Sequence, residues 1–511
     1  MTSGIHHVTL ITSNVQRNVD FYAGFLGLRL VKQTAGFEDA RQLHLFYGDA
    51  EGSPGSLVSF LVWEDGNPGR VGHGQVTEIA LSIPGDEVGA WITKALRHQI
   101  QTEGPVREFG EPVLRMRDPD GVTVKLVASN LPPNAPWKDA PARLHSVTIW
   151  SERPGETAQF LDQFGYSAGP AEGALQRLTS DRDAIDIRDA SGFVPGASGT
   201  GIADHVALRV PDQSSLEAHA SALQAAGIGP VNLHDRAYFR SLYVREPAGT
   251  LIELATDGPG FRVDEPAETL GESLKIPPHN ADRADDLVAT LPQFALPGEE
   301  RFPMRDLHFV HRFNRPKDPD GSVLLLLHGT GGDEADLMPL ARKLAPNATL
   351  LGVRGRSTEE GINRWFRRLS TTHFDQDDIR AEADAFAAFL QDVGTVYGID
   401  PTKITVIGYS NGANFAAALL ALNPGLIRRA VLLRPMAALE HLPQVDLHNT
   451  EVLTVTGAHD PYGAHAPRLI DWLRASGAKL DAHDLNEGHA LSSVDPQLTA
   501  DWVNRQTVEA H

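Results

Sequence analysis

A Gly-x-Ser-x-Gly motif centred on Ser410 could supply the nucleophile for an acyl-transfer reaction. The motif follows the apolar run 404–407 and precedes the alanine-rich segment 413–422, a pattern that predicts a strand, a tight turn and a helix. The glycines allow a strained turn that presents the serine hydroxyl at the end of the strand. A lone motif of this kind also occurs by chance, so its meaning depends on partners elsewhere in the chain.

The partners that Ser410 needs are a base and an acid, because serine is a weak nucleophile by itself. Asp460 follows the apolar run 452–456, where a strand is expected to end, and is the predicted acid. His489 comes later in the chain, after the last predicted strand, and is the predicted base. His459 competes for that role, but it lies beside Asp460 in sequence and is too near to it.

Short apolar runs alternate with helical stretches in this half of the chain, which indicates a parallel sheet buried on both faces. The runs are 323–327, 349–353, 404–407, 430–433 and 452–456. The first run leads into a glycine loop, 328–332, and the backbone N–H groups of Thr330 and Asn411 are the predicted oxyanion hole. Residues 303–511 resemble the carboxylesterase/phospholipase group of the α/β hydrolases, and this resemblance implies a small ester or acyl substrate.

A second candidate for chemistry is the pair of adjacent histidines, His6 and His7, near the start of the chain. The surrounding segment, 4–12, is rich in β-branched residues and predicts a strand. Successive side chains of a strand point to opposite faces, so we expect only one histidine to face a common interior. We expect that residue to be His7, acting as a metal ligand with partners far along the chain.

The first half of the chain repeats one order of elements: a strand, a helix and three strands. Repeats begin near residues 4, 75, 144 and 203. The spacing from Glu78 to His205 matches the spacing from Lys125 to Glu253 to within one residue, which indicates an internal repeat. Over residues 4–257 the four βαβββ modules resemble the vicinal oxygen chelate superfamily, which includes glyoxalases, extradiol dioxygenases and antibiotic-resistance proteins.

This resemblance implies that metal ligands come from the first and last strands of the modules. The residues at those positions are His7, Glu78, Ser146 and His205 on first strands and Lys125 and Glu253 on last strands. An ammonium has no free lone pair and a serine is a poor ligand, so His7, His205 and Glu253 remain. Two imidazoles and one carboxylate form the facial triad of non-haem Fe(II) oxygenases. The first module would then pair with the fourth; the plain alternative is three unrelated residues at strand ends.

The stretches 6–9, 26–32 and 47–49 are similar to the ring-cleaving dioxygenases that act on hydroquinones. This similarity implies Fe(II) as cofactor, with Mn(II) as the alternative metal, and O₂ as co-substrate. It also implies a small aromatic diol as substrate, of the hydroquinone type or the catechol type.

Three further residues are candidates for contact with the diol. Tyr243 is expected on the strand beside that of Glu253, where it could act as a hydrogen-bond donor or acid, and Arg236 could act as charge partner of a phenolate. His6 could orient the substrate or carry a proton. The alternatives are an edge-strand tyrosine, a surface arginine and a packed strand histidine. Four histidines outside the repeat pattern are expected to be surface or structural residues: His44, His73, His98 and His234.

The composition excludes several classes of function. The 511 residues carry 66 acidic and 45 basic side chains, a net charge of −21, which argues against nucleic acid or an anionic membrane as partner. No apolar run approaches the roughly 20 residues of a membrane span. No basic segment followed by an apolar core opens the chain, so the cytoplasm is the expected location. The chain has no cysteine, and its oligomeric state stays open, a homo-oligomer included.

We therefore predict a two-domain bifunctional enzyme of aromatic degradation. An α+β domain of four βαβββ modules, 1–258, is expected to cleave the ring, and a closing tail and linker, 259–302, is expected to lead to an α/β-hydrolase domain, 303–511, with a mainly parallel sheet. One alternative for the first domain is a glyoxalase-like lyase or isomerase, which usually offers a fourth protein ligand. Another is a metal-free quinone- or drug-binding resistance module, which typically lacks this ligand set.

Overall fold

The structure, a computed structural model, describes residues 4–229, 231–301 and 307–505. It divides into a first unit, which runs to Asp282 and includes Phe294–Glu300, and a second unit, which comprises Arg283–Gln293 and the chain from Arg301 onward. The predicted tail and linker segment, 259–302, is therefore shared between the two units. No helix in the described part of the chain is long and apolar enough to cross a membrane.

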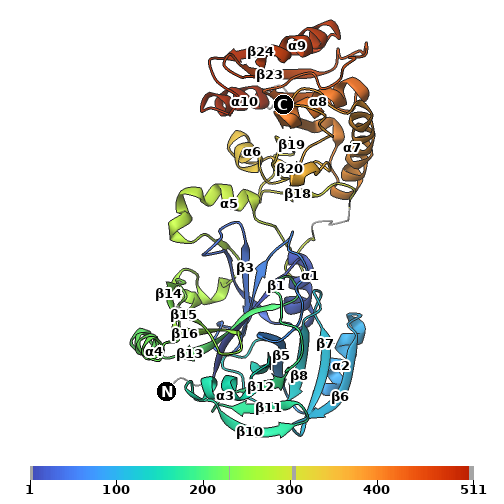
Figure 1. The fold of residues 1–511 in the computed structure, drawn as a ribbon. Helices are drawn as coiled ribbons and strands as arrows, with labels where there is room; N and C mark the ends of the chain where they lie inside the picture. The colour runs from blue at the N-terminus through green and yellow to red at the C-terminus, as the bar shows by residue number, and fades with distance from the viewer. Residues whose placement is uncertain (1–3, 230, 302–306, 506–511) are drawn as a thin grey trace. The chain divides into compact units, whose positions relative to one another are not determined.

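All four predicted βαβββ modules are present in the first unit (Figure 1). The first module contains β1 (Ile5–Thr12), α1 (Val15–Val19), a π-helical segment (Asp20–Phe25), β2 (Arg29–Ala35), β3 (Leu43–Gly48) and β4 (Leu57–Val62). The second contains β5 (Gln75–Ile83), α2 (Val88–Arg97), β6 (Thr102–Glu108), β7 (Glu111–Arg117) and β8 (Thr123–Ala128). The third contains β9 (Leu144–Ser151), α3 (Pro154–Asp162), β10 (Ser167–Glu172), β11 (Leu175–Thr179) and β12 (Ala184–Asp189). The fourth contains β13 (Ala203–Val210), α4 (Gln213–Ala225), β14 (Asn232–Asp235), β15 (Phe239–Arg245) and β16 (Leu251–Pro259).

The modules pair first with fourth and second with third. One nine-stranded sheet has the order β14-β15-β16-β13-β1-β4-β3-β2-β17, and one eight-stranded sheet has the order β10-β11-β12-β9-β5-β8-β7-β6. The central contact of each sheet is an antiparallel pair of first strands, β1 with β13 and β5 with β9. The predicted fold of this half and the predicted pairing of the first module with the fourth are confirmed.

The pairing of β1 with β13 contains two bulges, one on each strand. His6 is the extra residue on β1, between Ile5 and His7, and Asp204 is the extra residue on β13. A bulge changes the direction of the side chains around it. Both His6 and His7 are 2% exposed, and their rings contact each other. The expectation that only one of them faces the interior is therefore wrong, because strict alternation does not hold across a bulge.

The chain after β16 folds back onto the first module. It forms short 3₁₀ turns (Phe261–Val263, Ala267–Thr269 and Pro278–Arg283) and β17 (Leu274–Lys275), which pairs parallel with β2. Phe261 packs on Phe46 and Tyr238. The ammonium of Lys32 on β2 is fully buried and forms ion pairs with Asp264, at 2.6 Å, and with Glu265. The tail is thus held by an apolar contact and by a buried charge.

The second unit contains a seven-stranded sheet in the order β18-β20-β19-β21-β22-β23-β24, parallel except for its edge strand β18, as predicted. The elements before the serine motif are α5 (Ala284–Thr290), β18 (His311–Asn314), β19 (Val323–Leu327), α6 (Met338–Leu344), β20 (Thr349–Val353), α7 (Gln376–Tyr397) and β21 (Ile404–Tyr409), with 3₁₀ turns at Glu359–Gly361 and Pro401–Lys403. The elements after it are α8 (Asn411–Leu422), β22 (Arg429–Leu433), β23 (Glu451–Gly457), a 3₁₀ turn (Gly463–His465), α9 (Ala466–Ala475), β24 (Lys479–Leu485) and α10 (Val494–Asn504).

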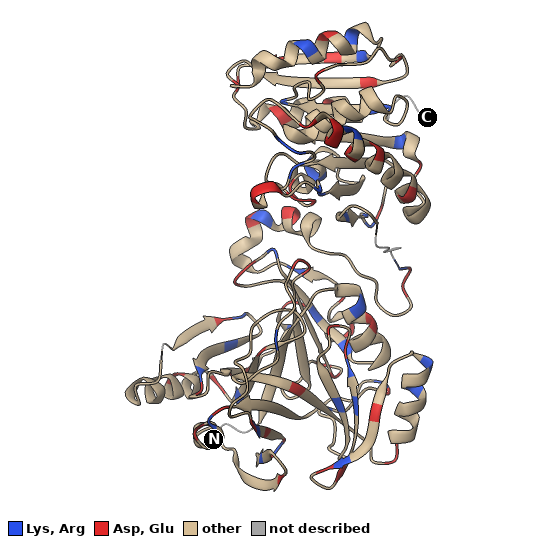
Figure 2. Cartoon of the chain, turned by 45° about the vertical axis from the view of Figure 1, so that its right-hand side comes forward, with Lys and Arg blue, Asp and Glu red and all other residues tan. Residues whose placement is uncertain are grey.

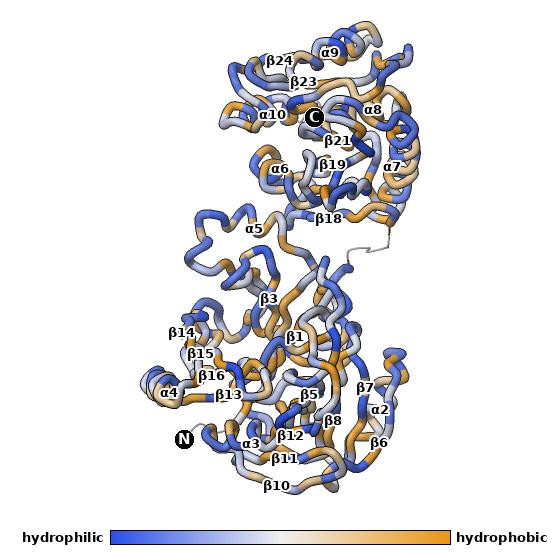
Figure 3. Tube along the Cα trace, in the orientation of Figure 1, coloured by the Kyte–Doolittle hydropathy of each residue, from blue (hydrophilic) through white to orange (hydrophobic). Residues whose placement is uncertain are grey.

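Helix α8 is the buried element that carries the serine motif. Each of its residues from Asn411 to Ala421 is buried, and its hydrophobic character contrasts with the mixed pattern of α7 (Figure 3). Its alanines permit close packing against β21, and Phe415 stacks on Trp365 at 4.9 Å between ring centroids. In the view of Figure 2, acidic and basic residues are interspersed along both units.

Replacing Lys32→Met should lower the free energy of unfolding of the first unit by about 3 kcal/mol, because Glu265 would stay buried without its closest cation. Urea unfolding followed by hydrogen-exchange mass spectrometry of β2 and β17 measures the change. Lys275→Met is the matched control: Lys275 lies 3.9 Å from the same carboxylate but is partly exposed, so it should cost less than about 1 kcal/mol. Equal losses in the two variants would contradict a role for the buried charge.

Candidate active sites

Three buried side chains converge at the centre of the nine-stranded sheet. The Nε2 atom of His7 lies 3.1 Å from Oε2 of Glu253, and the Nε2 atom of His205 lies 2.8 Å from the same oxygen. The two Nε2 atoms are 3.3 Å apart. All three potential ligand atoms lie within 4.8 Å of one another. The β1–β13 pairing brings the two histidines together, and the parallel pairing of β13 with β16 brings Glu253 beside them.

The other ring nitrogen of each histidine has its own partner. Nδ1 of His205 lies 2.7 Å from a carboxylate oxygen of Asp204. Nδ1 of His7 lies 2.9 Å from Nδ1 of His6, so one of these two rings donates a proton to the other. Both partners are the bulge residues that directly precede a histidine. Such contacts fix the orientation and the tautomer of an imidazole and leave Nε2 available as a ligand.

The charges of the cluster depend on each other. Burial by itself would raise the pKa of Glu253, but His7 and His205 hold it well below its usual value. Burial would lower the pKa of His205, but Glu253 and Asp204 raise it to about 9. Burial lowers the pKa of His7. The site therefore favours a carboxylate with one positive charge beside it.

The donor set fits a divalent cation. Glu253 is fully buried, and neither of its oxygens makes a hydrogen bond of acceptable geometry in the described part of the chain, although two imidazoles lie close by. Buried carboxylate oxygens without a hydrogen bond are costly, and a metal ion would satisfy them. Two imidazole nitrogens and one carboxylate oxygen that converge from three strands match the facial arrangement typical of non-haem iron.

Tyr243 and Arg236 lie next to this cluster. Tyr243 on β15 pairs directly with Glu253 across the antiparallel strands, as its predicted position requires, and its ring packs edge-on against His205 at 5.4 Å. The guanidinium of Arg236 lies over the Tyr243 ring at 5.5 Å and also donates to Glu38 at 2.7 Å. Burial, together with Glu253, raises the pKa of Tyr243, so its hydroxyl keeps its proton.

His44 is a neighbour of the site that the repeat pattern does not identify. Its ring packs on Phe46, and its Nε2 lies 3.2 Å from Oγ of Ser59. Burial, followed by the charges of His7 and His205, lowers the pKa of His44 to about 3. Alternation along β3 puts His44 on the same face as the core residue Phe46, and this is a signal that the sequence does contain.

The equivalent place in the eight-stranded sheet holds an ion pair. Lys125 lies 2.5 Å from Glu78 and 2.9 Å from Glu108, so its ammonium occupies a position comparable to that of a metal ion. Ser146 accepts or donates a hydrogen bond with the preceding His145 at 3.1 Å. Lys125 and Ser146 thus lie where the sequence pattern places them. Among the described residues, the cluster of three potential ligands occurs in the nine-stranded sheet.

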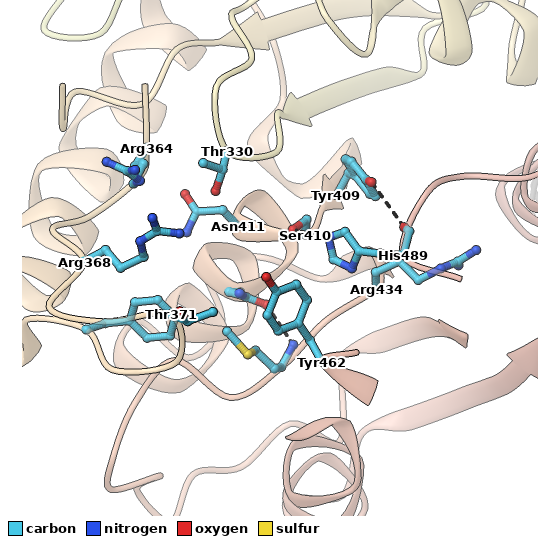
Figure 4. A pocket seen from close by; sticks show the side chains of 13 residues that line it. Thr330, Arg364, Arg368, Thr371, Tyr409, Ser410, Asn411, Arg434, Tyr462 and His489 are labelled. Atoms are coloured by element: carbon cyan, nitrogen blue, oxygen red, sulfur yellow. Dashed lines mark hydrogen bonds between the residues drawn. The ribbon is translucent and has the colours of Figure 1, made fainter. Parts of the chain in front are cut away.

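In the second unit, Ser410, His489 and Asp460 form a continuous chain of hydrogen bonds (Figure 4 shows the first two). Oγ of Ser410 lies 2.9 Å from Nε2 of His489, and Nδ1 of His489 lies 2.9 Å from Oδ2 of Asp460. His459 points elsewhere and bonds to Asn486 at 3.0 Å. The structure therefore brings together the three residues that the sequence indicated, in the geometry of a nucleophile, a base and an acid.

The turn at Ser410 is strained, and packing enforces it. Ser410 has φ +52° and ψ −114°, values that non-glycine residues rarely adopt. A Cβ atom at Gly408 would lie 2.7 Å from the backbone of the next helix, and a Cβ at Gly412 would lie 2.0 Å from the carbonyl oxygen of Leu327 on β19. Both glycines of the motif are therefore required for the close approach of the turn to the sheet.

Ser410 lines a cavity of roughly 310 Å³. Thr330 and Asn411, the two predicted oxyanion-hole residues, both line it, as does Tyr462, whose ring packs on His489 at 5.1 Å. Asn411 begins helix α8, so its backbone N–H belongs to the first turn, where such groups have no partner within the helix. A pocket of this size suits a small substrate.

Arg434 and Asp495 also belong to this site, although the sequence pattern does not indicate them. They form a bidentate ion pair at 2.7 and 2.9 Å, with both side chains fully buried. Arg434 also donates to the carbonyl oxygens of Gly488 and Ala490, on either side of His489. The pair therefore holds the loop that carries the histidine.

Comparison with known proteins agrees with both halves of the structure. Residues 4–126 match the Glyoxalase/Bleomycin resistance protein/Dioxygenase superfamily. MhqO of Bacillus subtilis, assigned as a ring-cleaving dioxygenase, is 33% identical over 287 residues, which are 54% of this chain and 91% of MhqO. Chlorohydroquinone/hydroquinone 1,2-dioxygenase of Sphingobium indicum is 30% identical, over 56% of this chain and 95% of that protein.

The second unit has a relative of its own. MhqD of Bacillus subtilis, assigned as a hydrolase, is 34% identical over 194 residues, which are 38% of this chain and 97% of MhqD. The chain thus belongs to the ring-cleaving dioxygenases of the Glyoxalase/Bleomycin resistance protein/Dioxygenase superfamily, joined in one polypeptide to an α/β hydrolase.

Proposed function

We propose that the first unit is an Fe(II)-dependent dioxygenase that opens a hydroquinone-type ring with O₂. The observation that supports this most directly is the buried convergence of His7, His205 and Glu253. The identity with a chlorohydroquinone/hydroquinone 1,2-dioxygenase supports the same class of substrate. Mn(II) is the alternative metal, since the donor set would accept either ion.

Each side chain at the cluster has a proposed task. His7, His205 and Glu253 hold the cation, and Asp204 and His6 keep the two imidazoles in the required tautomer. When bound, Fe(II) supplies Lewis acidity and one-electron chemistry for the activation of O₂. Outside the ligand set, the protonated hydroxyl of Tyr243 would donate to a phenolate oxygen of the diol, and Arg236 would stabilise its negative charge.

The contacts of His6 support a positioning task more directly than a contact with substrate. Its Nδ1 faces His7, and its ring also packs against Phe239 at 5.1 Å. Phe239 packs on His7 at 5.2 Å as well, so the aromatic ring restrains both imidazoles. Binding of substrate by His6 stays a prediction.

We propose that the second unit is a serine hydrolase of a small ester or acyl compound. Ser410 would attack the carbonyl carbon while His489 takes the hydroxyl proton, and Asp460 would stabilise the resulting imidazolium. The backbone N–H groups of Thr330 and Asn411 would stabilise the oxyanion. Fusion of the two units suits consecutive reactions, in which ring cleavage supplies the hydrolase with its substrate.

Glu253→Gln and His205→Ala should each remove iron from protein purified without oxygen and lower O₂ uptake with hydroquinone by at least about 100-fold, because each change deletes a ligand. Elemental analysis and an oxygen electrode provide the two measurements. Ser146→Ala is the matched control, since Ser146 holds the corresponding first-strand position in the other sheet and should leave both values unchanged. Full iron content in either ligand variant would contradict the proposed site.

Ser410→Ala should lower kcat for a p-nitrophenyl ester by about 10⁴-fold or more, because no other group can take the place of the attacking hydroxyl. O₂ uptake by the same protein should stay intact. His459→Ala is a suitable control, because His459 bonds to Asn486 and not to Ser410. Ester hydrolysis that survives in Ser410→Ala would show that another group is the nucleophile.

Asp495→Asn should lower kcat of ester hydrolysis by about tenfold to a hundredfold with a smaller change in KM, because Arg434 would lose the partner that fixes it beside the His489 loop. Steady-state kinetics separates the two constants, and thermal unfolding of the same sample shows whether the unit is folded. Asp501→Asn is the control, because Asp501 lies on the same helix, α10, and bonds only to the exposed Gln497 among the contacts described. A change in KM alone would argue against positioning of His489.

A further inference from the structure

The cavity at Ser410 has a one-sided charge. The charged residues among its described lining are three arginines, Arg364, Arg368 and Arg434, together with the histidine of the catalytic chain, and no aspartate or glutamate lies on this lining. The whole chain, in contrast, carries a net charge of −21. An arginine-lined pocket in an acidic protein points to a ligand with negative charge.

The three guanidinium groups differ in how far they are already neutralised. Arg434 is fully paired with Asp495 and is engaged in holding the His489 loop. Arg364 is 2% exposed, donates to the carbonyl oxygen of Glu359 and lies 3.4 Å from the exposed carboxylate of Glu360. Its Nε is nevertheless buried without a hydrogen-bond partner.

Arg368 is the exposed member of the three and the one with the fewest protein partners. Its backbone N–H donates a hydrogen bond to the carboxylate of Glu359, but its guanidinium makes no hydrogen bond or ion pair in the structure as described. Figure 4 shows its side chain extending toward Asn411, the residue that follows the nucleophile. The neighbouring Arg367, in contrast, is bound by Glu359 and Asp375 and is not part of the lining.

We propose that Arg368 binds a carboxylate of the substrate, with the positive charge of Arg364 supporting it, so that the hydrolase acts on small esters or acyl compounds that carry a second, anionic carboxylate. A planar guanidinium binds a carboxylate through two parallel hydrogen bonds, which fixes the orientation of the substrate as well as its charge. The apolar lining residues Phe374 and Met436 would accept the hydrocarbon part between the two functional groups. This inference rests on the proposed hydrolase function and specifies its substrate class.

The same property connects the two proposed reactions. When both atoms of O₂ enter the bond between a hydroxylated ring carbon and its neighbour, that C–C bond breaks and each carbon gains one oxygen atom. The hydroxylated carbon becomes a carboxylic acid and its neighbour a carbonyl carbon, with O₂ as the sole oxidant. The acid is ionised near neutral pH. Where the neighbouring carbon carries a leaving group such as chloride, it becomes an acyl carbon that a serine hydrolase can attack. The new carboxylate is then the kind of anion that the arginine-lined pocket would bind.

Binding of succinate to the full-length protein, measured by calorimetry, tests the proposal without any turnover. Succinate should bind, and the neutral succinamide should not. Arg368→Gln should weaken succinate binding by roughly tenfold to a hundredfold, the value of a hydrogen-bonded charge. Arg367→Gln removes the same charge one residue away, outside the pocket, and should leave binding within about twofold.

Kinetics with a neutral ester separates this proposal from the proposed hydrolase function. In Arg368→Gln, succinate should lose its competitive inhibition of p-nitrophenyl butyrate hydrolysis, whereas in Arg367→Gln the inhibition should stay. No binding of succinate, equal binding of succinamide, or an equal effect of Arg367→Gln would overturn the carboxylate site even if the ester is hydrolysed. Failure to hydrolyse p-nitrophenyl butyrate, with succinate still bound at Arg368, would instead refute the hydrolase function.

Discussion

The antiparallel pairing of β1 with β13 is the interaction on which the first unit depends. It joins residues almost two hundred positions apart and brings His7 and His205 to one point at the centre of a nine-stranded sheet. The two bulges in this pairing are equally important, because they add one residue before each histidine. Those residues, His6 and Asp204, supply the partners of the two Nδ1 atoms. The strand pairing therefore brings the two imidazoles together, and its two bulges provide the contacts that orient them.

The eight-stranded sheet has the same architecture but lacks the cluster of two histidines and one glutamate. Bulges occur in the β5–β9 pairing as well, and Glu78 stands in the place of a ligand. There the cation is part of the protein: Lys125 is buried and bound by Glu78 and Glu108. The two sheets thus differ: Glu78 is 21% exposed and pairs with a lysine of its own module, whereas Glu253 is fully buried and lies beside a histidine of another module. A permanent ammonium gives a closed structural ion pair, whereas two imidazoles and a carboxylate would leave room for an exchangeable cation.

The sequence predicts the parts of this protein that repeat or that follow a motif. The module order follows from the repeat, and the pairing of the first module with the fourth and the positions of His7, His205 and Glu253 follow from the repeat register together with the superfamily resemblance. The positions of Ser410, Asp460 and His489 follow from motif context. It does not predict features that depend on a break in a regular pattern. Side-chain alternation fails at the His6 bulge. Alternation along β3 could have placed His44 beside Phe46, but only if the buried face of β3 were already known. Nor does any local pattern join Arg434 to Asp495, since the two residues are 61 positions apart and meet only in the folded chain.

The charge of the protein raises a last physical question, which is how an acidic chain would attract an anion. At physiological ionic strength the field of distant charges falls off over about 8 Å, so the net charge of −21 acts mainly on approach and weakly inside a pocket. Within the cavity the nearest charges decide, and these are guanidinium groups. A neutralised arginine such as Arg434 contributes shape and hydrogen bonds but little net attraction. An uncompensated one, Arg368, contributes a charge that is available to the ligand, so selectivity would come from this residue rather than from the overall field.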